Sequence, residues 1–274
     1  MLILTLAGCA GVPSVKNRNG LAQALARGAG MEKSFVRTKA SVITVYSRLK
    51  DVSAPVNVYI EGDGLAWMSR RKVSRDPTPV DPVALRLAVK DPSSNVVYIA
   101  RPGQYLLFGA GNCDPAYWSS ARFSADVVDS ISQAIDQACA KIKPVQINII
   151  GYSGGGALAV LVAANRQDIA SIRTVAGNLD TRKFTEYHKV SPMDRSLNPA
   201  DYAQKVSLIP QCHYSGAKDK VVPAFVAASY LGRVKDSSCI ELVLVPGVSH
   251  QQGWADAWPA LLKRGCPCGA RNSR

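Results

Sequence analysis

Residues Val145 to Ala157 read Val-Gln-Ile-Asn-Ile-Ile-Gly-Tyr-Ser-Gly-Gly-Gly-Ala, and this stretch decides the fold. Its first half is an apolar run typical of a buried strand, and its second half is a small-residue run that begins a helix. A serine at a sharp turn between a strand and a helix is the setting of the Gly-x-Ser-x-Gly nucleophile elbow. Gly151 and Gly155 fit this turn, because a Cβ at either position would collide with the neighbouring strand or helix. The alternative is an ordinary glycine-rich link, but the flanking strand and helix favour a nucleophilic Ser153.

A nucleophilic serine needs a base, and the chain has three histidines. His250 follows the strand-like run 240–245 and precedes a helical pattern at 253–258. It therefore lies on a loop at the carboxyl end of a strand, where α/β proteins carry their chemistry. His213 lies within a probable strand and is expected to be a packed structural residue. His188 lies in a polar segment, where we expect a solvated or substrate-facing side chain. His250 is the predicted base.

The base needs a carboxylate that fixes its tautomer and stabilises the imidazolium. Asp219 follows the strand-like run 208–214 and is the preferred candidate. Asp180, on the loop after the preceding strand, is the competitor. The order Ser153, Asp219, His250 is that of α/β-hydrolase triads and differs from the orders in the chymotrypsin and subtilisin folds.

Acyl transfer also needs amide donors aimed at the developing oxyanion. One is expected from Gly154, directly after the nucleophile. The other is expected from the loop Glu61-Gly62-Asp63-Gly64, which follows the strand-like run 56–60. Asp63 and Gly64 are the candidates, because the glycines let the backbone turn an N–H inward.

On these residues the chain resembles the α/β-hydrolase superfamily over roughly residues 35–262. The resemblance implies a mostly parallel central sheet with helices on both faces, a Ser153–His250–Asp219 triad, and no cofactor or metal. It also implies an oxyanion hole formed by the amides of Gly154 and the 61–64 loop. Three further segments are similar to a bacterial group of α/β hydrolases: Arg101–Tyr105, Ala176–Asp180 and Ser196–Asp201. The 61–64 loop lacks the His-Gly start common in lipases and esterases, so the choice between Asp63 and Gly64 stays open.

The remaining pattern fits one catalytic domain over residues 35–265, because strand-like runs alternate with helical ones. Ser124 is the expected cap of the helix that precedes the nucleophile strand. Residues 177–205 form a short, polar, cap-like insertion without the mobile apolar lid of many lipases, which favours small or medium-sized esters. Trp67, Tyr105 and Trp118 are candidates for the substrate pocket, although packing is the commoner role of aromatic side chains on loops.

The N-terminus resembles a bacterial lipoprotein signal. Leu6-Ala7-Gly8-Cys9 is similar to a lipobox, in which Cys9 would be lipidated and residues 1–9 would end the signal. The apolar run is short and no Lys or Arg precedes it, so we expect the true start to lie upstream, and a chance match is the alternative. Ala10 after the cysteine is similar to the outer-membrane sorting pattern. The expectation is a protein anchored in the bacterial envelope, with residues 10–34 as tether and N-terminal segment.

Six cysteines remain if Cys9 carries lipid, an even number that suits an oxidising compartment but leaves 15 connectivities. Cys266 and Cys268, in the basic tail 266–274, are too close for easy mutual bonding. The spacing offers no zinc motif. The formal net charge of +13, with clusters at 70–75 and in the tail 264–274, suits an anionic surface such as lipid or an envelope polymer, although solvated surface is the commoner role of such charges. No nucleic-acid motif is present, and we expect a monomer.

The sequence thus predicts a serine-dependent carboxylic ester hydrolase. The same groups could serve an acyltransferase or a peptidase. An alternative of another class is a non-catalytic envelope lipoprotein that keeps the fold as a binding module.

Overall fold

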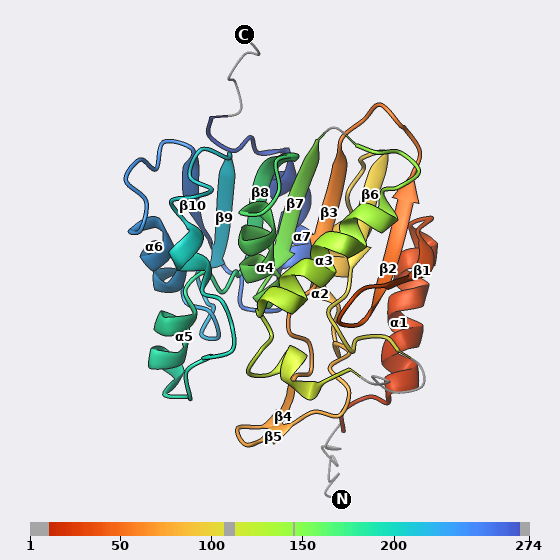
Figure 1. The fold of residues 1–274 in the computed structure, drawn as a ribbon, viewed down its shortest axis with the longest axis horizontal. Coiled ribbons are helices and arrows are strands. Elements are labelled where there is room, and N and C mark those ends of the chain that lie inside the picture. The colour runs from red at the N-terminus through yellow and green to blue at the C-terminus, as the bar shows by residue number, and fades with distance from the viewer. Residues whose placement is uncertain (1–10, 107–112, 145, 269–274) are drawn as a thin grey trace, which may run out of the picture.

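The computed structural model describes residues 11–106, 113–144 and 146–268. Its centre is an eight-stranded sheet in the order β1-β2-β6-β3-β7-β8-β9-β10 (Figure 1). β2 is antiparallel to both of its neighbours, and all other pairs are parallel. The strands are β1 (Glu32–Arg37), β2 (Val42–Leu49), β3 (Val56–Ile60), β6 (Asn95–Ile99), β7 (Ile147–Tyr152), β8 (Ile169–Val175), β9 (Gln211–Gly216) and β10 (Ile240–Val245). The mostly parallel sheet expected from the sequence is confirmed.

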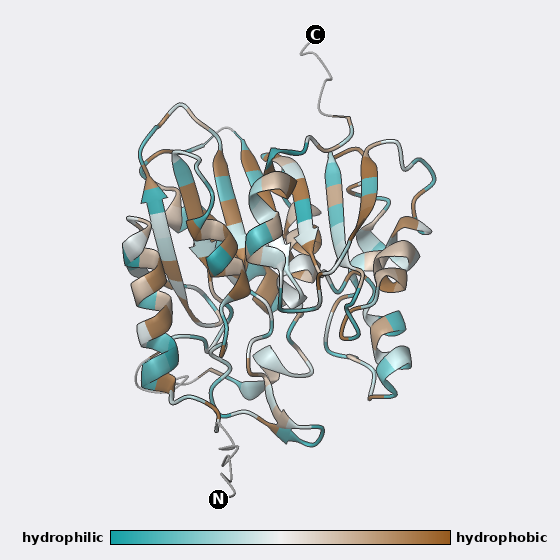
Figure 2. Cartoon of the chain, turned by 180° about the vertical axis from the view of Figure 1, so that it is seen from behind, coloured by the Kyte–Doolittle hydropathy of each residue, from teal (hydrophilic) through white to brown (hydrophobic). Residues whose placement is uncertain are grey.

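Helices cover both faces of this sheet. One face carries α3 (Ala125–Ala138), α4 (Gly154–Ala163) and α6 (Ala224–Leu231), and the other carries α1 (Val15–Gly28), α2 (Val83–Val89) and α7 (Trp254–Lys263). Alternate strand residues serve the two layers, since Val58 packs in the first core and its neighbour Tyr59 in the second. Figure 2 shows hydrophobic residues along the inner strands, and both hydrophobic and hydrophilic residues on the outer helices.

Smaller elements extend from the carboxyl ends of the parallel strands. A hairpin of β4 (Trp67–Ser69) and β5 (Lys72–Val73) lies at the same end of the molecule as α5 (Thr181–His188) (Figure 1). Two 3₁₀ turns, η1 (Pro115–Trp118) and η2 (Pro199–Tyr202), complete the described elements.

Local sequence signals explain the helices next to the nucleophile strand. The Ser124 hydroxyl caps α3 by accepting a hydrogen bond from the amide of Val127, as expected. Every residue of α4 is buried, which its unbroken run of small and apolar residues permits. The helix that begins at the elbow is therefore held in the centre of the molecule.

The N-terminal segment differs from the expected tether, because residues 15–28 form α1. Ala22 and Ala26 lie one helical turn apart and are buried in the core beneath this helix. Near its start, Arg18 forms an ion pair with Asp76 and donates a hydrogen bond to the Thr78 carbonyl. Small residues at positions i and i+4 let the helix pack closely on the core. The helix was not predicted from the sequence because the segment has a polar composition. Cys9 lies outside the described residues.

The C-terminal tail is tied to the sheet by two disulfides. Cys212 bonds Cys266 and Cys239 bonds Cys268. The two closely spaced tail cysteines thus each reach a different partner, at the amino ends of β9 and β10. Cys113 and Cys139 are free thiols. Residues up to Cys268 are therefore part of the folded domain, beyond the boundary expected at residue 265.

Candidate active site

Ser153 stands at a strained turn between β7 and α4. Its φ of 51° and ψ of −117° lie in a region that side-chain-bearing residues rarely adopt. The two glycines of the motif are required by close approach. A Cβ on Gly151 would lie 2.1 Å from the Gly155 carbonyl oxygen, and one on Gly155 would lie 2.2 Å from that of Ile60 in β3. This packing turns the Ser153 side chain away from the sheet.

His250 joins Ser153 and Asp219 in one hydrogen-bonded line. The His250 Nε2 atom lies 3.0 Å from Ser153 Oγ, and Nδ1 lies 2.8 Å from Asp219 Oδ2. The other carboxylate oxygen of Asp219 accepts hydrogen bonds from the amides of Val221 and Val222, both at 2.8 Å. These amides and the burial of the Asp219 side chain fix the carboxylate. The structure thus brings together the three residues selected from the sequence.

Two aromatic side chains hold the backbone of His250. The Tyr152 hydroxyl and the Trp254 indole N–H both donate to the His250 carbonyl, at 3.0 and 2.9 Å. The Tyr152 ring also packs on the imidazole, with centroids 5.4 Å apart. Sequence reasoning did not identify this pair. The available signal was Trp254 itself, because a buried indole N–H needs an acceptor nearby.

The competing residues have other partners. Asp180 caps α5 through the amides of Arg182 and Lys183, and its carboxylate also accepts from Ser229 and Asn198. His213 is fully buried between Thr174 and Gln211, where burial lowers its pKa to about 3 and keeps it neutral. The hydrogen bonds of these two residues thus go to groups outside the triad.

His188 lies at the end of α5, where its Nε2 donates a hydrogen bond to the Val221 carbonyl at 2.7 Å. Its side chain is half-buried, so it is less exposed than the solvated side chain expected from the sequence, and a substrate-facing role stays a prediction.

The 61–64 loop lies against the elbow. A Cβ on Gly62 would lie 3.2 Å from Ser153 Cβ, and one on Gly154 would lie 2.0 Å from Asp63 Oδ1. Gly64, with φ of 63°, packs instead against the carbonyl of Pro77. Within the described residues, no hydrogen bond occupies the amides of Gly154 or Asp63. These two amides are therefore free to bind an oxygen next to Ser153.

Two arginines fix the side chain of Asp63. Arg101 Nη1 lies 3.0 Å from Oδ1, and Arg122 Nη1 lies 3.1 Å from Oδ2. Arg101 is fully buried, and it also donates to the Arg122 carbonyl, at 2.5 Å. The side chains of Asp63, Arg101 and Arg122 together carry one net positive charge. The negative charge of the Asp63 carboxylate is therefore compensated where it approaches Gly154.

Glu61 places a further carboxyl group beneath the site, in addition to those of Asp219 and Asp63. It is almost fully buried and accepts hydrogen bonds from the Gly62 amide, at 2.9 Å, and the Tyr98 hydroxyl, at 3.0 Å. Burial, only partly opposed by these hydrogen bonds, raises the pKa of Glu61 to about 7. Sequence reasoning treated Glu61 only as part of a loop.

A cavity of about 620 Å³ opens over Ser153 and His250. Its walls combine apolar side chains, such as Phe184, Val221 and Val222, with Lys218, Lys220 and two glutamines. The three aromatic candidates from the sequence do not line it: Tyr105 and Trp118 are buried in packing, and Trp67 is exposed on β4. Tyr105 and Trp118 therefore have the packing role that is commoner for aromatic side chains on loops, and Trp67 lies outside the cavity lining.

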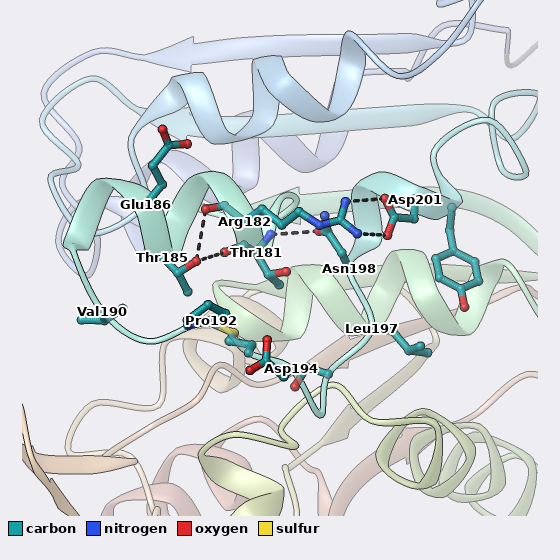
Figure 3. A pocket seen from close by; sticks show the side chains of 13 residues that line it. Thr181, Arg182, Thr185, Glu186, Val190, Pro192, Asp194, Leu197, Asn198 and Asp201 are labelled. Atoms are coloured by element: carbon teal, nitrogen blue, oxygen red, sulfur yellow. Dashed lines mark hydrogen bonds and ion pairs between the residues drawn. The ribbon is translucent and has the colours of Figure 1, made fainter.

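The 177–205 insertion encloses a second cavity, of about 890 Å³ (Figure 3). It lies between α5 and η2, and Arg182 spans one wall to reach both carboxylate oxygens of Asp201 at 2.7 Å. Met193, which lines this cavity, accepts a hydrogen bond from Arg122. None of the triad residues lines this second cavity.

In the part of the chain that the structure describes, no group of three or more His, Cys, Asp or Glu side chains is arranged to hold a metal ion. None of the described helices combines the length and apolar character needed to cross a bilayer.

No family model and no curated protein sequence matches the chain. Solved structures match it by shape. An alpha-beta serine hydrolase homologue from Coxiella burnetii superposes with a TM-score of 0.56 at 16% identity, over 84% of this chain and 93% of that one. Est1E from Butyrivibrio proteoclasticus gives 0.59 at 12% identity, over 84% and 95%. A membrane phospholipase A described as a bacterial virulence factor gives 0.59 at 16% identity, over 94% and 93%.

Proposed function

We propose that this chain, which has the α/β-hydrolase fold, is a serine hydrolase that cleaves carboxylic esters through an acyl-enzyme intermediate. The observation that carries the proposal is the continuous line Asp219–His250–Ser153, with contacts of 2.8 and 3.0 Å, ending at a strained serine inside a cavity. Strain of this kind persists only where the surrounding structure enforces it, and it clusters at functional sites.

In the proposed reaction, His250 Nε2 accepts the proton of Ser153 Oγ as that oxygen attacks the ester carbonyl. The carbonyl oxygen becomes an anion held by the amides of Gly154 and Asp63. His250 returns the proton to the leaving alcohol, and the acyl group stays on Ser153. Water then repeats the sequence and releases the acid. Asp219 holds the imidazole in the required tautomer throughout.

Asp63 is the preferred second oxyanion donor over Gly64. Its carboxylate touches Gly154 and is fixed by Arg101 and Arg122. Gly64 packs against Pro77 and so lies further from the elbow. Fixed donors contribute most to catalysis, because they need no reorganisation as charge develops.

The cavity favours small or medium-sized esters. A volume of about 620 Å³ suits a compact ligand, and the mixed polar and apolar walls suit an ester with a polar part. Acyl transfer to another alcohol and amide cleavage use the same groups and remain variants of this proposal. A binding module would have no use for the backbone strain at Ser153.

We further propose a lipid anchor at Cys9 and a location in the bacterial envelope. The lipobox-like Leu6-Ala7-Gly8-Cys9 supports the anchor, and the two disulfides suit an oxidising compartment. Mass spectrometry of protein purified from envelope fractions would detect the diacylglyceryl group on Cys9. An unmodified Cys9 in that sample would contradict the anchor.

The test of the hydrolase is labelling by a fluorophosphonate probe, followed by turnover of short-chain nitrophenyl esters. We expect one adduct on Ser153 and none in Ser153→Ala. Asp219→Asn should lower kcat by roughly 10⁴-fold. Asp180→Asn is the matched control, since Asp180 serves α5, and it should stay within about threefold of wild type. A folded protein without labelling would overturn the proposal.

A further inference from the structure

Large apolar side chains are exposed to solvent on the wall of the active-site cavity, on the β4–β5 hairpin and on α5 and α6. Trp67 and Met68 on the β4–β5 hairpin are 42% and 49% exposed. Tyr187 at the end of α5 and Phe225 at the start of α6 are exposed to a similar degree, as are Val80 and Val221 on the cavity wall. Exposed apolar groups gathered at one end mark a surface that meets another apolar phase.

Direct contacts join these segments into one continuous surface. Arg70 of the hairpin donates a hydrogen bond to the His188 carbonyl, at 3.2 Å. His188 in turn donates to Val221, and the ring of Tyr187 packs against Phe225 with centroids 5.3 Å apart. We call this surface the docking rim: Trp67 to Lys72, Tyr187, His188, Val221 and Phe225.

Positive charge accompanies the apolar groups. Arg70, Arg71, Lys72 and Arg75 are exposed on or beside the hairpin, and Lys218 and Lys220 lie at the cavity mouth. Within the described residues, none of these six forms an ion pair. Two acids near these cations are compensated, since Asp81 pairs with Arg86 and Glu186 with Lys183. The rim therefore attracts anions.

The N-terminal helix begins at this same end of the molecule. Arg18, in the first turn of α1, contacts Asp76 and Thr78, which follow the hairpin in the chain. Helix α1 thus starts at the end of the molecule that carries the hairpin (Figure 1). An anchor a few residues upstream would hold the rim, and not the opposite end, next to a membrane.

We propose that the docking rim binds the surface of an anionic lipid bilayer and turns the active-site opening toward it. An amphipathic indole and a flexible thioether at a hairpin tip, flanked by arginines and a lysine, match the boundary between headgroups and acyl chains. Each cation near such a surface adds attraction that extends over a Debye length. This inference concerns binding and does not depend on turnover.

The test uses the full chain with Cys9→Ser, so that no acyl chain contributes, and vesicles of phosphatidylcholine with or without phosphatidylglycerol. Trp118, Trp254 and Trp258 are buried, so a fluorescence change on binding reports Trp67. We expect co-sedimentation with the phosphatidylglycerol vesicles, a blue shift of emission, and weakening by salt. Ser153→Ala should bind equally well, which separates this test from the test of the hydrolase.

Two variants and two controls decide the outcome. Replacing Arg70, Arg71 and Lys72 by Ser should weaken partitioning by on the order of 100-fold. Trp67→Ala with Met68→Ala should abolish the blue shift and weaken binding by about tenfold. The controls carry matched changes at the other end of the sheet: Lys50, Lys141 and Lys235 to Ser, or Val52→Ser with Leu208→Ser. Equal loss in the controls, or binding to heparin but not to vesicles, would overturn the proposal.

Discussion

The two ends of the central sheet are built for different purposes. At the carboxyl ends of the parallel strands the chain carries a strained serine, a buried carboxyl group and two arginines that pair with one carboxylate. At the amino ends of β9 and β10 it carries two disulfides that fasten the C-terminal segment. The features at the first end lower the free energy of unfolding, and the disulfides at the second end raise it.

This contrast indicates that one end of the sheet carries the function and the other end stabilises the fold. The carboxyl end is expected to respond to substitution mainly in catalysis, and the amino end mainly in the free energy of unfolding. Changes at either end that broke this division would show that the two are coupled through the sheet.

Ser153→Gly should produce the largest effect and the sharpest contrast. Glycine adopts positive φ without strain, so the variant should gain about 1 kcal/mol in the free energy of unfolding. Loss of the nucleophile should lower kcat by roughly 10⁵-fold or more. Urea unfolding and ester hydrolysis measure the two effects. Ser153→Ala is the control, because it removes the nucleophile and keeps the strained backbone; equal stability of the two variants would contradict strain at the elbow.

Loss of both disulfides should give the opposite result. Cys266→Ser with Cys268→Ser opens both links and should lower the free energy of unfolding by about 3 to 5 kcal/mol. Below the unfolding transition, kcat should stay within about twofold of wild type, since the bonds lie at the far end of the sheet. Cys113→Ser, at a free thiol, is the matched control. A large fall in kcat of the folded double variant would show that the two ends communicate.

The sequence predicted the nucleophile turn because that turn follows from local geometry. Gly151 and Gly155 are needed by backbone contacts within a few residues or with the adjacent strand. Asp219 and His250 could also be selected, since each follows an apolar run and parallel strands end at one edge. Their distances from Ser153 came only from the structure.

The features that sequence reasoning missed depend on tertiary contacts. Tyr152 and Trp254 both donate hydrogen bonds to the His250 carbonyl, from 98 and 4 positions away in the chain. No periodic pattern in the sequence predicts that these two side chains share one acceptor. The helix at 15–28 was hidden because its polar surface masked two buried alanines. The 15 connectivities assume that all six cysteines are paired, whereas the structure has two bonds and leaves Cys113 and Cys139 free, a pattern that depends on how β9 and β10 lie beside the tail. Trp67, one of three candidates for the pocket, lies on β4 outside the cavity lining, and a single aromatic residue carries no periodic signal that would show this.

Glu61 offers the smallest effect and a test through pH. Its pKa is about 7 in the folded protein, raised by burial from an ordinary value of 4.5. Below pH 4.5 the group is protonated in both the folded and unfolded states and has no effect on stability. As pH rises from 4.5 to 7, the unfolded chain releases the proton more readily, so the free energy of unfolding falls. Well above pH 7 the loss is complete, at about 3 kcal/mol for a pKa raised from 4.5 to about 7.

Glu61→Gln removes this titration while keeping an acceptor for the amide of Gly62. The difference in unfolding free energy between wild type and Glu61→Gln should therefore move against wild type by about 2 to 3 kcal/mol between pH 4.5 and pH 8. Urea unfolding at the two pH values measures it, and the other titrations cancel in the difference. A constant difference would mean that Glu61 is ionised throughout, held by the Gly62 amide and Tyr98. The carboxyl end of the sheet would then carry less destabilisation than its burial indicates, and the contrast with the disulfide-bonded end would rest on Ser153 alone.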